Sequence, residues 1–165
     1  TYDAEKECWV IKFNKDVTVV GDDAFSSCRS LTSVTIPDSV TTIGGEAFSG
    51  CNSLTSVTIG NSVTTIGGCA FEACNSLTSV TIGNSVTTIG NYAFYECKSL
   101  KNITIGKGVS EIGKQAFKEC NIDTIVCCPK IPPKIDDSFG KFENLIIPTC
   151  CEEAYANSDW GQYHK

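Results

Sequence analysis

The chain has 165 residues, 41% of them hydrophobic and 19% charged, and its formal net charge at pH 7 is -6. An acidic chain lacks the basic surface that nucleic-acid binding requires, and no apolar stretch reaches the roughly 18 residues of a membrane-spanning helix. The one histidine, His164, lies beside the end of the chain, where a frayed terminus cannot position a catalytic imidazole. We therefore expect no nucleic-acid partner, no membrane insertion and no histidine-based catalysis.

A regular repeat organises the sequence: NSLTSVTIGNSVTTIGG at residues 52–68 returns as NSLTSVTIGNSVTTIGN at residues 75–91. The repeat length is therefore 23 residues, and apolar residues recur at this interval in columns. The columns include Leu31, Leu54, Leu77 and Leu100; Val34, Val57, Val80 and Ile103; Ile36, Ile59, Ile82 and Ile105; Val40, Val63, Val86 and Val109; and Ile43, Ile66, Ile89 and Ile112. Coils starting near residues 8, 31, 54, 77, 100, 122 and 142 predict a single repeat domain over residues 1–165.

Within each coil, the first predicted element is a short strand. In residues 31–36, LTSVTI, apolar and polar side chains alternate, which predicts that Val34 and Ile36 point inward while Ser33 and Thr35 point outward. Because each coil returns the chain to the same place one step along the axis, the strands should form a parallel, in-register sheet. A second extended piece, SVTTIG, follows, and residues 47–51 are expected to return the chain as one short helical turn.

Two further columns, one of phenylalanine and one of cysteine, lie in the returning part of the coil. They contain Phe25, Phe48, Phe71, Phe94 and Phe117, and Cys28, Cys51, Cys74, Cys97 and Cys120. Neighbouring cysteines of such a column have Cβ atoms about 4.8 Å apart, against a mean of about 3.8 Å in a disulfide, so we expect reduced, buried thiols.

Cysteines outside this column leave other possibilities open. Cys69, Cys128, Cys150 and Cys151 lie at variable positions, and a disulfide between the Cys127–Cys128 and Cys150–Cys151 regions is possible from the sequence. Zinc is disfavoured because adjacent cysteine pairs lack the two-residue spacer of a zinc knuckle. We expect no metal and no other cofactor.

The motif LTSVTIPDSVTTIGGEAFSGC at residues 31–51 resembles the consensus of the BspA-like leucine-rich repeats of bacterial surface proteins. Pro148, Tyr155 and Trp160 are similar to the terminal coils of that family. The resemblance implies a leucine-rich-repeat solenoid of right-handed coils, mostly β. It also implies an extracellular or cell-surface protein. The chain begins at Thr1 and contains no methionine, so we expect a processed or trimmed fragment without its targeting segment.

The candidate ligand-binding residues are the outward columns of the predicted sheet and two tyrosines of the returning segment. They are Ser33, Thr35, Ser56, Thr58, Ser79, Thr81, Asn102, Thr104, Tyr92 and Tyr95. The resemblance to surface adhesins implies binding of a protein, such as a host extracellular matrix protein, or of a glycan, by a monomer. The alternative is a structural spacer or stalk within a larger surface protein. No outward column combines a nucleophile with a base or pairs two carboxylates, so the sequence predicts no enzyme and no catalytic residue.

The last predicted element is a C-terminal cap over residues 149–165. Open sheet edges invite one array to stack on another, so the segment around Tyr155, Trp160 and Tyr163 should fold over the last coil and bury Trp160.

Overall fold

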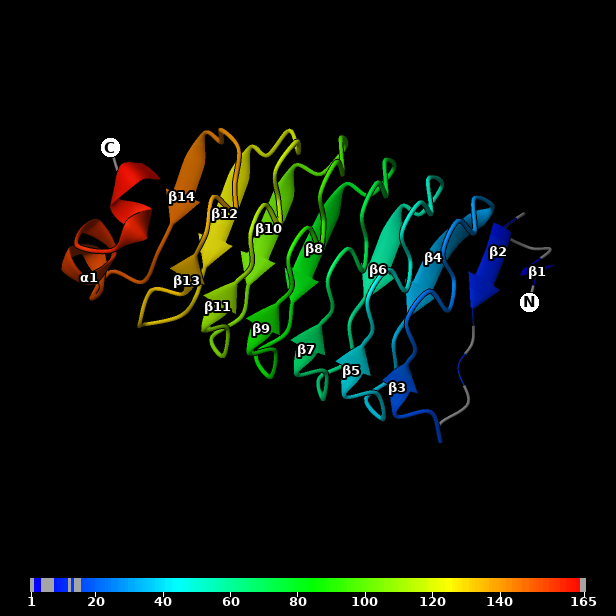
Figure 1. Cartoon of the computed structure of the whole chain (residues 1–165). Helices are drawn as coiled ribbons and strands as arrows, with labels where there is room; N and C mark the ends of the chain where they lie inside the picture. The colour runs from blue at the N-terminus through cyan, green and yellow to red at the C-terminus, as the bar shows by residue number, and fades with distance from the viewer. Residues whose placement is uncertain (1, 4–7, 12, 14–15, 164–165) are drawn as a thin grey trace.

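The computed structural model describes residues 2–3, 8–11, 13 and 16–163 and shows an elongated solenoid of parallel strands (Figure 1). His164 lies outside the described residues. One side, which we call the long-strand face, carries β2 (Cys8–Ile11), β4 (Leu31–Thr35), β6 (Ser56–Thr58), β8 (Ser79–Ile82), β10 (Asn102–Ile105), β12 (Thr124–Cys127) and β14 (Asn144–Ile146). A short strand, β1 (Tyr2–Asp3), pairs antiparallel with β2.

The second extended piece of each coil forms a separate six-stranded parallel sheet, which we call the short-strand face. Its strands are β3 (Val19–Val20), β5 (Thr42–Ile43), β7 (Thr65–Ile66), β9 (Thr88–Ile89), β11 (Glu111–Ile112) and β13 (Lys134–Ile135). Equivalent residues pair directly, as Thr65 does with Thr88, so the predicted parallel register is confirmed. Each coil from that of β2 to that of β12 thus contributes one strand to each face, and the last coil contributes only β14.

The core between the two faces is built from the predicted apolar columns. Leu54, Leu77 and Leu100 are fully buried. Beside them, phenylalanine rings stack along the axis from Phe25 to Phe139, with neighbouring centroids 5.0 to 5.3 Å apart and rings within 14° of parallel. Because each ring contacts rings of the adjacent coils, burial of one coil depends on its neighbours.

The returning segment differs from the expected short helical turn at residues 47–51. Residues 45–50 form reverse turns, with Glu46 at φ 53° and Gly50 at φ 70°. The N–H groups of both residues donate to the next coil, at Gly68 O and Glu72 O, over 2.9 and 2.8 Å. These hydrogen bonds between coils alternate with local turn bonds such as that from Ser49 N to Glu46 O, and the same pattern recurs at Cys69.

The C-terminal segment closes the solenoid with α1 (Glu152–Ala156) and a 3-10 turn, η1 (Asp159–Tyr163). Trp160 is fully buried, which confirms that prediction, and its ring lies 5.2 Å from Phe139. Figure 1 shows this cap at the end of the array opposite the N-terminus. Over the described residues, neither helical element has the length or apolar character to cross a membrane.

Candidate functional site

The polar columns of the long-strand face point to solvent because the residues between them are buried. In β8, Val80 and Ile82 are buried, while Ser79 and Thr81 are exposed. The eight sheet residues fall into two groups: Thr35, Ser56, Thr58, Ser79, Thr81 and Asn102 are exposed, and Ser33 and Thr104 are half-buried. The face therefore offers short hydroxyl and amide groups without charge.

Parallel register aligns these side chains into two rows. Ser33 pairs with Ser56 in the first row, and Thr35 pairs with Thr58 in the second. Toward the C-terminus, Ser79 is the partner of Asn102 in the same way. The strands hydrogen-bond in two groups, one ending at β6 and the other beginning at β8, so the hydrogen-bonded sheet is interrupted between these strands. We place the candidate surface on both groups and call it the polar face.

Tyr92 and Tyr95 lie on the returning turns rather than on the polar face. Both are half-buried, and their rings meet edge to face with centroids 5.6 Å apart. Desolvation and the nearby carboxylates, first of them Glu96 and then Glu119, raise the pKa of Tyr95. The charges that act on Tyr95 are therefore acidic.

Buried cysteines make a regular hydrogen-bonded column. The thiol of Cys74 donates to the carbonyl oxygen of Phe48 at 3.3 Å, and Cys97 donates to Phe71 at 3.1 Å. Desolvation raises the pKa of the Cys51 thiol to about 11. Such thiols remain protonated and unreactive near neutral pH. Cys28, at the N-terminal end of the same column, is exposed, which differs from the expectation that the whole column is buried.

Cysteines outside the column are also free thiols. Cys69 is half-buried, and desolvation together with Glu72 raises its pKa to about 11, so it is a poor nucleophile. The sulfur atoms of Cys150 and Cys151 lie 3.3 Å apart. None of the cysteines with described side chains, including Cys128, forms a disulfide in this structure. The disulfide between the two C-terminal cysteine regions is therefore not formed.

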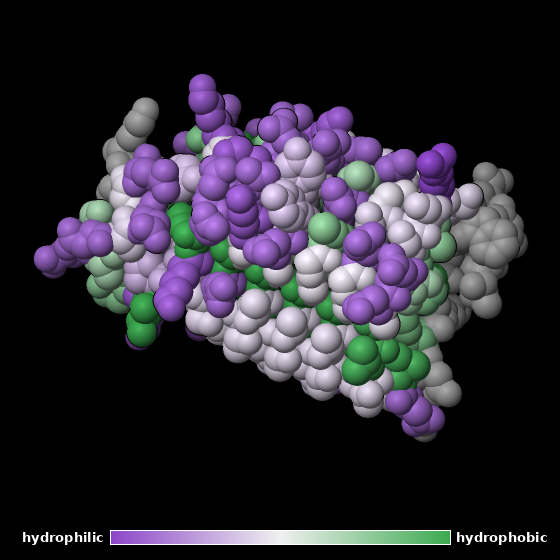
Figure 2. All heavy atoms as spheres, in the orientation of Figure 1, coloured by the Kyte–Doolittle hydropathy of each residue, from purple (hydrophilic) through white to green (hydrophobic). Residues whose placement is uncertain are grey.

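Threonines of the short-strand face form a second polar array, to which the sequence assigns no role. The Oγ1 atoms of Thr64 and Thr87 donate to backbone carbonyls of the preceding coil, at 3.1 and 3.2 Å, and the Thr41 hydroxyl does the same at 3.3 Å. Figure 2 shows this side as an evenly spaced, pale array over β5 to β11. Because their protons are already donated within the solenoid, these hydroxyls offer a ligand chiefly acceptor oxygens.

A family model described as a BspA type leucine-rich repeat region matches residues 11–146 in six copies. None of the curated proteins compared with the chain matches it.

Three similar solved structures come from bacteria. A leucine-rich repeat protein of T. pallidum superposes with a TM-score of 0.69 at 23% identity, covering 92% of this chain and 84% of that one. A leucine-rich cell surface protein of Faecalibacterium prausnitzii gives 0.69 at 28% identity, covering 88% and 34%. The pneumococcal vaccine antigen PcpA gives 0.67 at 18% identity, covering 90% and 44%, which shows a shared fold. The chain thus spans less than half of these last two proteins.

Proposed function

Since the chain belongs to the BspA-type leucine-rich repeat family, we propose that it is a non-enzymatic cell-surface or extracellular module that binds a protein ligand through its polar face. The cell-surface assignment of the Faecalibacterium relative supports this location. The partner class that fits is a host extracellular matrix protein or a glycan, bound by a monomer. The observation that carries the proposal is the pair of exposed, in-register rows on the long-strand face.

The backbone that holds these rows limits the ordering cost of binding. Each strand of the polar face is hydrogen-bonded to at least one neighbour, and its inward side chains are packed in the core. A rigid, preformed surface loses little conformational freedom when a ligand docks on it. Hydroxyl and amide groups supply donors and acceptors, and because the rows are uncharged, affinity should depend only weakly on salt.

The chemistry of the described residues supports a binding role over an enzymatic one. The buried thiols are held protonated, as the pKa of about 11 at Cys51 illustrates. The hydroxyls of the short-strand face donate to backbone carbonyls rather than to a general base. A nucleophile needs such a base within hydrogen-bond reach.

The first test is binding of the chain to immobilised matrix proteins and mucin glycans. The double variant Thr58→Lys/Thr81→Lys should abolish binding, since it places two charged side chains on the polar face. The matched control, Thr64→Lys/Thr87→Lys, adds the same charge to exposed threonines of the other face and should bind as the wild type does. Thermal unfolding of both variants verifies that the fold is retained.

A different result would move the site to the tyrosine pair. If the polar-face variant keeps full affinity while Tyr92→Ala and Tyr95→Ala lose it, the polar face is the wrong surface.

A spacer is the second candidate function, and one observation favours it. Between Leu31 and Gly90 the only charged residues are Asp38, Glu46 and Glu72. A neutral, repetitive array suits a stalk as well as a receptor. Failure of the wild-type chain to bind any matrix protein or glycan would favour the spacer.

A further inference from the structure

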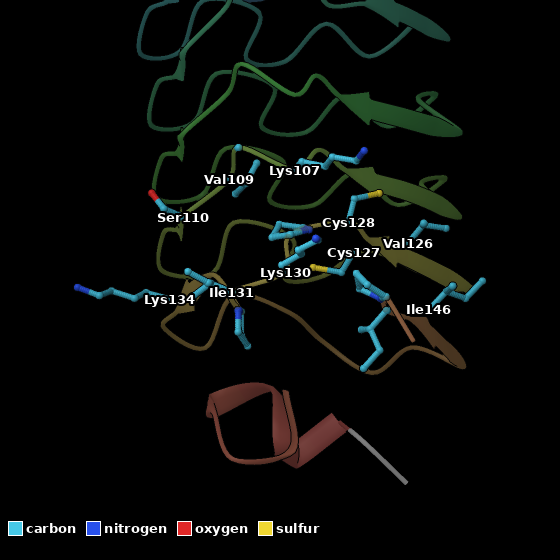
Figure 3. Close-up of a pocket in the computed structure, with 15 residues that line it drawn as sticks. Lys107, Val109, Ser110, Val126, Cys127, Cys128, Lys130, Ile131, Lys134 and Ile146 are labelled. Atoms are coloured by element: carbon cyan, nitrogen blue, oxygen red, sulfur yellow. The ribbon is translucent and has the colours of Figure 1, made fainter. Parts of the chain in front are cut away.

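A groove of about 890 Å³ opens between loops near the C-terminal end of the solenoid (Figure 3). Its walls come from three successive coils: residues 107–110 between β10 and β11; residues 126–132 from the end of β12 and the loop after it, with Lys134 at the start of β13; and residues 146–148 from the end of β14 onward. None of these residues is among the candidate ligand-binding residues, although Val126 and Ile146 continue the row of Thr104 along the long-strand face.

The groove exists because the loop after β12 departs from the repeat. In earlier coils this loop stacks on its neighbour through backbone N–H groups, as when Lys107 N donates to Asn84 Oδ1 at 3.0 Å. Pro129, Pro132 and Pro133 have no N–H to continue such stacking. The loop is also longer than its counterpart in the preceding coil. The register shows this, because the strands before the two loops pair Asn102 with Thr124, whereas those after them pair Glu111 with Lys134.

The cap holds both ends of this loop in place. The hydroxyl of Tyr155 donates to Pro129 O at 2.8 Å, and the indole N–H of Trp160 donates to Pro133 O at the same distance. Both donors are buried. Between these anchors, Ile131 remains 83% exposed. The outer wall of the groove is therefore fixed before any ligand arrives, with a large apolar side chain left in solvent.

The groove combines apolar walls with positive charge. Lys107, Lys130 and Lys134 line it, and no carboxylate does so among the described residues. The ion pairs found in the described part of the chain use other lysines. In Figure 3 the Lys130 side chain lies in the middle of the groove. Ile146, 54% exposed, adds a second apolar side chain.

We propose that this groove is a second binding site, which takes a small amphiphilic carboxylate. The alkyl body would lie against Val109, Ile131 and Ile146, and the carboxylate beside the ammonium group of Lys130. The volume falls within the range of about 300–1,000 Å³ that is common for small-molecule sites. Unpaired cations on an acidic chain provide the charge complementarity, and exposed isoleucines provide surface that gains from being covered.

The test is calorimetric titration of the 165-residue chain with decanoate below its micelle concentration. Decan-1-ol has the alkyl body without the charge, and acetate has the charge without the body. We expect saturable binding of one decanoate per chain, about tenfold weaker binding of the alcohol, and none of acetate. Raising the salt concentration should weaken the binding of decanoate but not that of decan-1-ol.

Variants locate the site. Lys107→Gln/Lys130→Gln/Lys134→Gln should weaken decanoate binding about tenfold. The matched control, Lys98→Gln/Lys114→Gln/Lys141→Gln, removes the same charge from exposed lysines outside the groove and should bind as the wild type does. Ile131→Ser should weaken both decanoate and decanol, whereas Val19→Ser, at an exposed valine near the other end, should weaken neither.

Several results would overturn the proposal. They are no decanoate binding, equal affinity for the alcohol and the carboxylate, or equal losses in the two triple variants. The other occupant to exclude is an acidic, apolar peptide. If a peptide of alternating Glu and Leu binds the groove and decanoate does not displace it, the ligand is a protein segment and the small-molecule proposal fails.

Discussion

Each phenylalanine in the middle of the core has an aromatic neighbour in both adjacent coils. Phe71 lies 5.2 Å from Phe48 and 5.1 Å from Phe94, and all three are fully buried. A residue in this position contributes to two coil interfaces at once. The stack therefore makes stability cooperative along the axis, since one lost ring weakens the packing on both sides.

Phe71→Ala should lower the free energy of unfolding by about 3–5 kcal/mol, because it leaves a cavity that the stacked coils cannot fill. Urea denaturation followed by circular dichroism measures the change. Phe25→Ala is the matched control, since Phe25 is only half-buried near the N-terminal end of the stack and should cost less. Equal losses at the two positions would show that the stack does not act as described.

The cysteine column makes stability depend on pH in the alkaline range. Desolvation raises the pKa of Cys51 from 9.0 to about 11, so the folded state keeps its proton where the unfolded state loses it. This contribution is full below pH 9 and is lost as the pH rises through about 11. The urea midpoint should therefore fall between these values. Cys51→Ala should show a shallower fall, and Cys74, Cys127 and Tyr155, whose pKa burial also raises, contribute the remaining slope.

At the scale of the element, the strands could be predicted and the returning turns could not. Alternation in LTSVTI and the regular interval of the repeat predicted both extended pieces of each coil and the outward position of Ser79 and Thr81. The spacing of Ala47, Phe48 and Cys51 is also compatible with a helical turn. The positive φ at Glu46 is required by hydrogen bonds to the next coil, and such non-local bonds are not visible within one repeat.

The same reasoning explains why the groove was missed while the polar face was expected. Outward columns follow from periodicity, so the exposed side chains of the long-strand face were predictable residue by residue. The loop at residues 128–133 departs from the repeat, and its shape depends on Tyr155 and Trp160, which lie in the cap beyond the next coil. Its three prolines were the available signal, because proline interrupts backbone stacking between coils.

Tyr155→Phe should destabilise the chain by about 1–3 kcal/mol, because it leaves the carbonyl of Pro129 without its buried donor. Thermal unfolding measures the loss, and hydrogen exchange should rise at the N–H groups of Cys128 and Lys134, which donate to carbonyls of the preceding coil. The control is Tyr92→Phe, which removes a hydroxyl from a half-buried tyrosine of the returning turns. A Tyr155→Phe chain as stable as the wild type would show that the cap does not anchor this loop.

At the scale of the whole molecule, the stacking of the coils determines where the two proposed binding sites lie as well as how stable the chain is. The middle coils are nearly uncharged, whereas Lys107, Lys130 and Lys134 gather near the C-terminal end. The two proposed sites should therefore respond differently to salt. As the ionic strength rises, affinity at the neutral polar face should stay nearly constant, whereas affinity for a carboxylate in the groove should fall. One titration series at two ionic strengths separates them.

We also expect the cap to keep the chain monomeric. Trp160 covers Phe139, the last ring of the parallel stack, and Tyr163 lies against Phe142 with centroids 4.9 Å apart. Deleting residues 149–165 would expose these rings beside the open edge of β14. An unpaired strand next to apolar surface is a template for another chain.

The truncated chain should therefore form dimers or larger species that grow with concentration, and its unfolding temperature should fall. Size-exclusion chromatography with light scattering measures the mass. The control is a chain shortened only by residues 164–165, which keeps Trp160 and Tyr163 and should match the full chain. A chain lacking residues 149–165 that stayed monomeric and equally stable would show that the C-terminal segment is not a cap, because Trp160 and Tyr163, which pack against Phe139, would then protect nothing.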